Sequence, residues 1–491
     1  MPGRAISIPV CPVTSFRRPV TRTKARSVSE WLLAAACACH ALGAAATDLL
    51  QVYDRATVTD PLIQQATATR LAIRETRTQA LIGLLPFDLS ANKYFQGVGG
   101  MPVTTPATMS LTLAVNLFSW SSWVALKSAD ATVAQGEANF LAAQQSLVQR
   151  VTAQYFAVLA AQDTLSAQQI ALQSAQIQLD QAEQRFNVGL TAITDVEIAR
   201  ASRDSTNAAV IAAKRALATQ MDLLRAITGE TYPTLAGPGD DMPLLSPEPA
   251  DEDAWVGTAM DQNASLVASR MASEIARDGL LAAYGGHLPT IGINVYRNWA
   301  LEHGNFTPPA ETSALLGVLT PFTGNTDTIW QVGISVPIFT GGAVQSKVRQ
   351  ARYTWDAAKA GLDYTSRQTE EQTRDAYQGV ISQISQVQAL RQAVQSSRLS
   401  LQASEAGYVV GIKTAVDVLT SRELFVQAET NYAQAKYGYL DNIVSLRLAA
   451  GSLDRRTVEM INSWLNEDKP AQPSAPQNPF MPPGALTAPP P

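Results

Sequence analysis

The sequence predicts an α+β membrane protein made of two structural repeats, each with a pair of β-strands and one very long helix. Three observations support this fold class. A turn motif occurs twice, as RFNVGLTAITDV from Arg185 and as GYVVGIKTAVDV from Gly407. Two segments alternate apolar with polar or small residues, which is typical of strands. Two longer segments repeat apolar residues every seven positions, which is typical of helices packed as coiled coils.

The two ends of the 491-residue chain differ from its middle. Six Lys and Arg residues precede the apolar run WLLAAACACHALGAAA, which ends in an A-x-A motif, so residues 1–46 are expected to be a secretory signal peptide. Cys11, Cys37 and Cys39 all lie in this segment, and cleavage would leave a chain without disulfides. Lipidation at Cys37 or Cys39 is the alternative. Residues 456–491 are rich in proline and are expected to form a disordered tail.

Composition and motifs exclude several classes of function. The formal net charge is −5, and it falls to about −10 without residues 1–46, so nucleic acid is not an expected partner. After cleavage only His287 and His303 remain and no cysteine does, and the sequence has no nucleophile motif or phosphate-binding loop. We therefore expect no metal, no cofactor and no enzymatic activity. The sequence also has no run of 18 apolar residues, so strands must carry any role within a membrane.

The repeat extends far beyond the turn. We place the first repeat at 47–232, a linker at 233–252 and the second repeat at 253–455. The second repeat carries 18 extra residues between Pro289 and Phe339, which indicates an exposed loop. At a constant offset of 222 positions, the matching pairs include Tyr155 with Tyr377, Leu179 with Leu401, Glu183 with Glu405, Arg200 with Arg422, Leu224 with Leu446 and Gly229 with Gly451.

Each repeat is expected to supply two strands. The alternation is clear from Met109 to Leu117 and from Trp330 to Ile338, and it is less regular in Phe87 to Phe95 and Thr290 to Tyr296. Four strands cannot close a barrel, because membrane barrels begin at eight strands, so the chain must oligomerise to span a membrane. Eight strands from a dimer would be filled by side chains, whereas twelve from a trimer would leave a passage. Two half-buried hairpins in a soluble protein are the alternative.

A long helix is expected between strand and turn in each repeat. The segment from Trp120 to Phe186 has no proline and would span about 100 Å at ~1.5 Å per residue. Between Leu141 and Gln184 it carries only four charged residues, fewer than a soluble coiled coil usually has beside its seam. A soluble coiled coil nevertheless remains the alternative. The heptad positions are Val151, Val158, Leu165, Leu172, Leu179 and Phe186 in the first copy, and Val380, Val387, Val394, Leu401 and Tyr408 in the second.

The chain resembles the TolC family of outer-membrane efflux ducts. The resemblance runs from TDLLQVYDRATVTDP near the start of the mature chain, through AITGETYP, GGHLPT and both turns, to AAGSLD, which ends at Asp454. It implies a homotrimer with a twelve-stranded outer-membrane β-barrel, four strands per chain, continued across the periplasm by a long α-helical barrel with coiled-coil packing. It also implies contact with outer membrane lipid, with a periplasmic adaptor (a membrane fusion protein), and with an inner-membrane pump of RND or ABC type.

The resemblance also assigns roles to the two turns. Gly189 and Gly411 would allow each long helix to reverse at the periplasmic tip, where the adaptor docks. Bonds between neighbouring hairpins, from Thr194 and Asp195 to Tyr408 and Lys413, would hold the mouth shut. The residues expected at the tip are Val188, Gly189, Leu190, Val410, Gly411 and Ile412.

Two departures from the family pattern concern the mouth. Lys413 stands where the family has an arginine, which keeps the positive charge but loses the bidentate fork. Asp417 would line the pore constriction, but the family's second aspartate is Thr420 here, so a single ring of carboxylates is expected. Local structure offers an alternative role for both aspartates, because Asp195 and Asp417 each follow a turn, where aspartate often caps a helix. Tyr408, at a heptad position, could simply pack.

The function expected from these observations is a passive exit duct for tripartite multidrug efflux, type I protein secretion or both. It would reside in the outer membrane, extend into the periplasm, and open at its periplasmic tip when adaptor and pump engage it. The alternative is a structural or adhesive coiled-coil protein of the cell envelope without a pore. The sequence does not name the cargo.

Overall fold

In the computed structural model the chain divides into two units, Met1–Ala45 and Ala46–Pro491. The structure describes residues 46–84, 87–92, 95–98, 101–104, 108–239, 242–300 and 328–470, which all belong to the second unit. The expected signal peptide lies outside the described residues apart from Ala46. The same holds for residues 301–327, which contain most of the predicted loop insertion, and for the proline-rich segment after Pro470.

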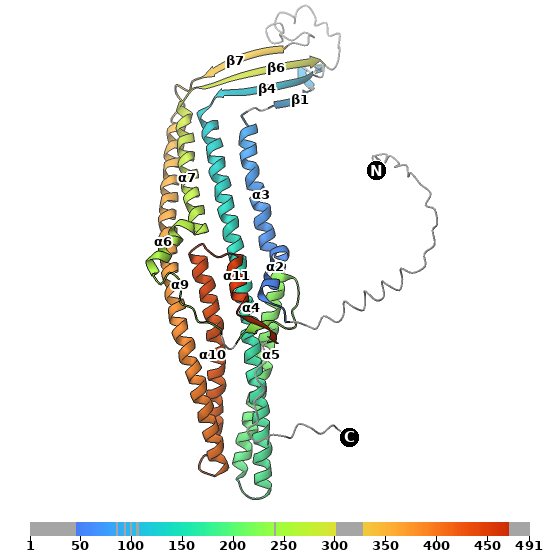
Figure 1. Ribbon diagram of the computed structural model, residues 1–491. Helices are drawn as coiled ribbons and strands as arrows, with labels where there is room; N and C mark the ends of the chain where they lie inside the picture. Colours follow the sequence, from blue (N-terminus) through green and yellow to red (C-terminus); the bar gives the residue numbers. More distant parts are fainter. Residues whose placement is uncertain are drawn as a thin grey trace, which may run out of the picture. The chain divides into compact units, whose positions relative to one another are not determined.

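The helices and strands follow the predicted order (Figure 1). The first half of the chain forms α2 (Leu49–Thr59), α3 (Pro61–Ile82), β1 (Phe87–Asn92), β2 (Phe95–Val98), β3 (Met101–Thr104), β4 (Thr108–Phe118), α4 (Trp120–Asn187), α5 (Ile193–Thr228) and β5 (Ala236–Pro238). The second half forms α6 (Glu252–Gln262), α7 (Ala264–Tyr284), the 3-10 helix η1 (Gly285–His287), β6 (Thr290–Ala300), β7 (Thr328–Ser335), α9 (Ala343–Val409), α10 (Ala415–Ala449), α11 (Arg455–Asn462) and β8 (Leu465–Pro470).

One antiparallel sheet contains the four predicted strands in the order β1-β4-β6-β7. Leu113 on β4 lies opposite Val295 on β6, which in turn lies opposite Trp330 on β7, so apolar residues form a row across one face. Two strand ends differ from the prediction. The first strand ends at Asn92, and β2 pairs with β3 in a separate sheet. The fourth strand ends at Ser335, before Pro337, whose nitrogen has no hydrogen to extend the ladder.

The two long helices match the heptad prediction. Helix α4 has 68 residues and begins at Trp120 as predicted, where the side chain of Ser119 accepts a hydrogen bond from the Ser122 backbone nitrogen. Helix α9 has 67 residues. The heptad residues Val158 and Val380 are almost fully buried, whereas Phe186, near the turn, is 40% exposed. Among the described residues, no helix is both long and apolar enough to cross a membrane.

The two long helices each pack against their return helix, α4 against α5 and α9 against α10, and the largest core forms where these two hairpins meet α2 and α11. Tyr155, Phe156 and Tyr439 are fully buried there. The hydroxyl of Tyr155 donates to the carbonyl of Ala236, 2.7 Å away, and so ties α4 to the short β5–β8 sheet.

The C-terminal boundary corrects one prediction. Residues 456–491 were expected to be disordered, yet α11 covers Arg455–Asn462 and β8 pairs with β5. Val458 and Ile461 on one face of α11 are fully buried, so this helix belongs to the core. Proline is abundant only after α11. The prediction of disorder from that proline-rich segment was extended to the residues before it, so the short amphipathic helix was not predicted.

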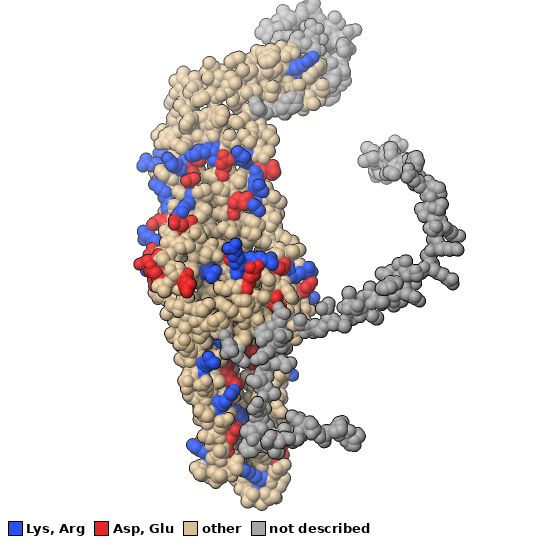
Figure 2. Space-filling model, viewed as in Figure 1, with Lys and Arg blue, Asp and Glu red and all other residues tan. Residues whose placement is uncertain are grey.

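Charged side chains are unevenly distributed. On the face shown in Figure 2 they gather over the helices, whereas the strand region is almost free of them. Several of these charges join separate helices. Arg150 on α4 contacts the buried Asp60 at the start of α3 at 2.6 Å, and Lys127 on α4 contacts Asp278 on α7 at 2.9 Å. These pairs fix the helices that connect the sheet to the hairpins.

Candidate functional site at the two hairpin tips

The two hairpin turns have the same backbone geometry. In the first, the Leu190 nitrogen donates to the Arg185 carbonyl at 2.8 Å, and the Gly189 nitrogen donates to the Phe186 carbonyl at 2.9 Å. The corresponding bonds of the second turn run from Ile412 to Gly407 and from Gly411 to Tyr408, at 2.8 and 3.2 Å. This is the Schellman arrangement, and it requires a left-handed residue. Gly189 and Gly411 supply it, with φ of 74° and 80°.

Large apolar side chains are exposed at both tips. Val188 and Leu190 are 69% and 77% exposed, and Val410 and Ile412 are 67% and 80% exposed. A soluble surface rarely gathers apolar side chains in this way unless another molecule covers them. The predicted tip residues therefore lie together on each turn and present an apolar contact surface.

Asp417 caps helix α10. Its Oδ2 accepts hydrogen bonds from the backbone nitrogen and the hydroxyl of Thr414, both at 2.9 Å, and its own nitrogen donates to the Thr414 hydroxyl at 3.2 Å. These bonds to Thr414, backbone first, lower the pKa of Asp417 below its usual range. The capping role weighed from the sequence is therefore real, and both bonds end on the same carboxylate oxygen.

Asp195 starts α5 differently. The N-cap residue of α5 is Ala192, which has no side-chain cap, and Asp195 Oδ2 instead accepts a hydrogen bond from the Thr191 hydroxyl. Thr194 is exposed beside it. Thr420, one turn after Asp417, is also exposed and donates its hydroxyl to the Val416 carbonyl at 3.0 Å. Among the described residues, no hydrogen bond or ion pair within one chain joins Thr194 or Asp195 to Tyr408 or Lys413.

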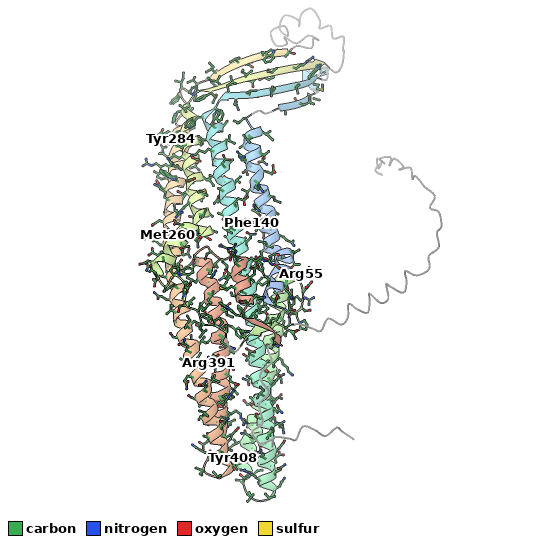
Figure 3. The ribbon with its side chains drawn as sticks, viewed as in Figure 1. Arg55, Phe140, Met260, Tyr284, Arg391 and Tyr408 are labelled. Carbon is green, nitrogen blue, oxygen red and sulfur yellow. The ribbon has the colours of Figure 1, made fainter. Side chains whose placement is uncertain are left out.

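Tyr408 and Lys413 lie at the tip of the α9–α10 hairpin, where Figure 3 labels Tyr408. The ring of Tyr408 contacts a residue of the other hairpin, because the guanidinium carbon of Arg185 lies 4.7 Å from the ring centroid. Lys413 folds over the helix end, and its Cγ would be 2.8 Å from a Cβ placed on Gly407. Neither the Tyr408 hydroxyl nor the Lys413 ammonium has a hydrogen-bond partner within the part of the chain that the structure describes.

Sequence reasoning missed two kinds of contact near the tips. Arg185 was not singled out, because nothing in its local pattern indicates that it reaches the second hairpin. Each hairpin also carries an ion pair between its two helices, Glu183 with Arg200 at 3.3 Å and Glu405 with Arg422 at 2.5 Å. The signal for these pairs was present, since both partners recur at the offset of 222.

Residues of the types that bind metal ions do not cluster in the described part of the chain. No group of three or more His, Cys, Asp and Glu residues there could hold a metal ion. His287 ends the 3-10 helix η1 before strand β6, and His303 lies outside the described residues.

Comparisons with known proteins agree with this arrangement. The family model of the outer membrane efflux protein matches residues 52–230 and 255–452. Outer membrane protein TolC of Escherichia coli is 32% identical over 442 residues, which cover 88% of each chain. The alkaline protease secretion protein AprF of Pseudomonas aeruginosa is 24% identical over 466 residues, covering 91% of this chain and 93% of AprF.

Solved structures show the same fold. The Campylobacter jejuni CmeC outer membrane channel superimposes with a TM-score of 0.67 at 18% identity, over 85% of this chain and 89% of CmeC. The two segments that match the family model contain the two hairpins described above. The chain therefore belongs to the family of outer membrane efflux proteins.

Proposed function

We propose that this outer membrane efflux protein is a homotrimeric exit duct, in which three chains close one twelve-stranded β-barrel and continue it as a tube of helices. The four-stranded sheet carries the proposal. Within it, β1 and β7 are edge strands, and Trp330, Val332 and Ile334 of β7 are 68–73% exposed. An exposed apolar edge strand needs a partner strand. Three such sheets would give twelve strands, enough to leave a passage.

The mass of the detergent-solubilised protein tests this assembly. Three copies per particle are expected, because only full closure removes the unpaired edges of β1 and β7. A folded monomer that inserts stably into a membrane would contradict the proposed barrel.

The hairpin tips would form the periplasmic mouth of this duct. In a trimer, two hairpins from each of three chains would surround one opening. Because the Tyr408 hydroxyl and the Lys413 ammonium have no hydrogen-bond partner among the described residues of their own chain, they are available to bond to Thr194 and Asp195 of a neighbouring hairpin. Lys413 offers one charged group rather than the two-pronged fork of an arginine, so its bond is less directional. The carboxylate of Asp417 would line the same opening.

The exposed apolar side chains at the tips would dock a periplasmic adaptor. Val188, Leu190, Val410 and Ile412 all project from the turns, and burial of such side chains is the main source of binding energy in helical contacts. Through the adaptor the duct would meet an inner-membrane pump. The name of AprF refers to protease secretion, and the family is named for efflux, so both protein and small-molecule cargo are proposed. The relatives give no support to a coiled coil without a pore.

Single-channel current in a planar bilayer tests the gate. The double variant Tyr408→Phe with Lys413→Ser removes the hydroxyl and the ammonium, and conductance should rise because hydrogen bonds to charged groups contribute about 1.5–3 kcal/mol each when shielded from water. Lys359→Ser is the matched control, since Lys359 lies on the same helix but pairs locally with Asp356 at 2.8 Å. Unchanged conductance in intact trimers of the double variant would remove these two residues from the gate.

A further inference from the structure

Near the tips, a contact between a guanidinium and an aromatic ring joins the two hairpins within a single chain. Higher up, Tyr437 on α10 donates its hydroxyl to Asp163 on α4 at 2.7 Å and stacks on Phe156. Arg185 lies 22 residues beyond Asp163 on helix α4, about 33 Å further along at ~1.5 Å per residue. There Arg185 meets the ring of Tyr408, with 4.7 Å between guanidinium carbon and ring centroid.

Both partners of this contact are fixed by their own turns. The Arg185 carbonyl accepts the bond from the Leu190 nitrogen, and the Tyr408 carbonyl accepts the bond from the Gly411 nitrogen. Both side chains are partly buried. A movement of one turn relative to the other would therefore separate guanidinium from ring, and the contact couples the two turns directly.

The contact is not a by-product of the repeat. At the offset of 222, Tyr408 corresponds to Phe186, so both hairpins carry an aromatic ring, but Arg185 corresponds to Gly407, so the second hairpin lacks the cation. Gly407 has a separate purpose, because its missing side chain leaves room for Lys413. The two copies thus differ at the cation, which only the first turn has, and Arg185 contacts the ring of the second turn.

We propose that Arg185 is a positioning residue of the gate, and that its cation–π contact with Tyr408 holds the two hairpins of each chain together in the shut state. This rests on the gating function proposed above. A guanidinium attracts the face of an aromatic ring, and the ring rather than the hydroxyl of Tyr408 serves this contact. The hydroxyl stays free for the neighbouring hairpin. The ring of Tyr408 would thus contact Arg185 of its own chain while its hydroxyl bonds to the neighbouring hairpin.

The test measures single-channel open probability in a set of variants. Arg185→Gln keeps a long polar side chain but removes the cation. At exposed sites such a contact changes an equilibrium about twofold to fivefold, so three symmetric copies should raise the open probability about tenfold to a hundredfold. Arg185→Lys keeps a cation over the ring and should restore much of the shut state. Arg398→Gln is the matched control, since Arg398 lies 5.7 Å from the ring of Phe425 within one hairpin and should not affect opening.

Coupling to Tyr408 separates this role from a purely structural one. In a Tyr408→Phe background, which keeps the ring, Arg185→Gln should raise the open probability by the same factor as in the wild type. In a Tyr408→Leu background, which lacks the ring, it should have no further effect. An equal effect in both backgrounds, or no effect of Arg185→Gln in the wild type, would overturn the proposal. If Lys413→Ser opens the channel while Arg185→Gln does not, this inference fails and the proposed gate stands.

Discussion

The α4–α5 and α9–α10 hairpins share a turn but begin their return helices differently. Gly189 and Gly411 adopt nearly the same φ and close the same pair of backbone bonds. Thr414 and Asp417 then form a reciprocal capping box on α10, whereas α5 begins after Ala192, which has no side chain able to cap. The second hairpin therefore holds its return helix by side chains that the first hairpin lacks.

The helix seams above the turns also differ. In the first hairpin, Leu179, Ala182 and Val196 form a small apolar core. The residue at the position of Ala182 in the second hairpin is Ser404, which is buried and bonds to Ser421 across the seam at 2.8 Å. A polar layer thus replaces an apolar one.

The comparison teaches which features of a duplicated hairpin are free to change. The reversal of direction depends on backbone bonds and one glycine, so both copies keep it. The cap, the seam and the residues facing the other hairpin are side-chain features, and there the second copy has Tyr408 and Lys413 where the first copy has Phe186 and Thr191.

The largest expected effect concerns the second pair of repeated glycines, at the ends of the return helices. Gly229 and Gly451 have φ of 75° and 73°. A Cβ on Gly229 would meet no atom within 4 Å, whereas one on Gly451 would overlap the Gln262 carbonyl and lie 2.8 Å from the Asn263 nitrogen. Gly229→Ala should cost about 1–2 kcal/mol from the left-handed backbone alone. Gly451→Ala should cost about 1–3 kcal/mol more, which thermal unfolding followed by circular dichroism would measure.

Equal melting temperatures for the two glycine variants would contradict this expectation. They would mean that the loop after Gln262 can move away from Gly451 at no cost, and the two helix ends would then be equivalent.

A buried carboxyl group distinguishes the two return helices at their upper ends. Asp441 on α10 corresponds to Thr219 on α5, and Asp441 Oδ1 is buried without a hydrogen-bond partner among the described residues. Burial raises the pKa of Asp441 to about 6 from its usual 3.8. Between these values the folded chain holds a proton that the unfolded chain has lost, so stability should fall as pH rises through that window and level off above pH 6.

The variant Asp441→Asn tests this difference. At pH 7.5 its free energy of unfolding should exceed that of the wild type by about 1–2 kcal/mol, and its melting temperature should be higher. This difference in stability should disappear below pH 4. Thr219→Asn is the matched control on α5 and should show no such pH dependence. An advantage that does not change with pH would mean that Asp441 acts through packing rather than charge.

The sequence predicted the backbone features of this chain better than its side-chain contacts. Heptads without proline located α4 within one residue at its C-terminal end, and a glycine followed six positions later by an aspartate located both turns. These features depend on residues close together in sequence. The Arg185–Tyr408 contact joins residues 223 positions apart and breaks the repeat, so neither periodicity nor duplication could indicate it. The helix α11 was missed because its burial depends on a core built from distant segments.

A smaller effect is expected when the polar layer of the second hairpin is converted to the apolar layer of the first. Ser421→Ala should lower stability by about 1 kcal/mol, because it leaves the buried hydroxyl of Ser404 without its partner. The double variant Ser404→Ala with Ser421→Ala should recover most of that loss, since replacing both partners leaves no unsatisfied group. Chemical denaturation of both variants measures the difference. If the double variant is the less stable of the two, the polar layer contributes more than a satisfied hydrogen bond.

The smallest expected effect concerns the carboxylates proposed for the mouth. Asp417 caps α10 through one oxygen, Oδ2, so its charge can serve the cap and the passage together. Three such carboxylates around a narrow axis would favour cations and create a site for a multivalent cation. Because Thr420 provides no second ring, block by a trivalent metal ion should require a higher concentration than two rings would.

Substitutions at these two positions separate the cap from the passage. Asp417→Ala should abolish most of the block and also lower the melting temperature, since the variant loses both the charge and the cap. Asp417→Asn keeps a side-chain oxygen for the cap and should lose the block with a smaller change in melting temperature. Thr420→Asp should lower the blocking concentration about twofold to fivefold, as expected for charges in contact with water. Titration of the trivalent ion against the wild type and these variants decides the matter, and equal block in all of them would leave Asp417 as a helix cap alone.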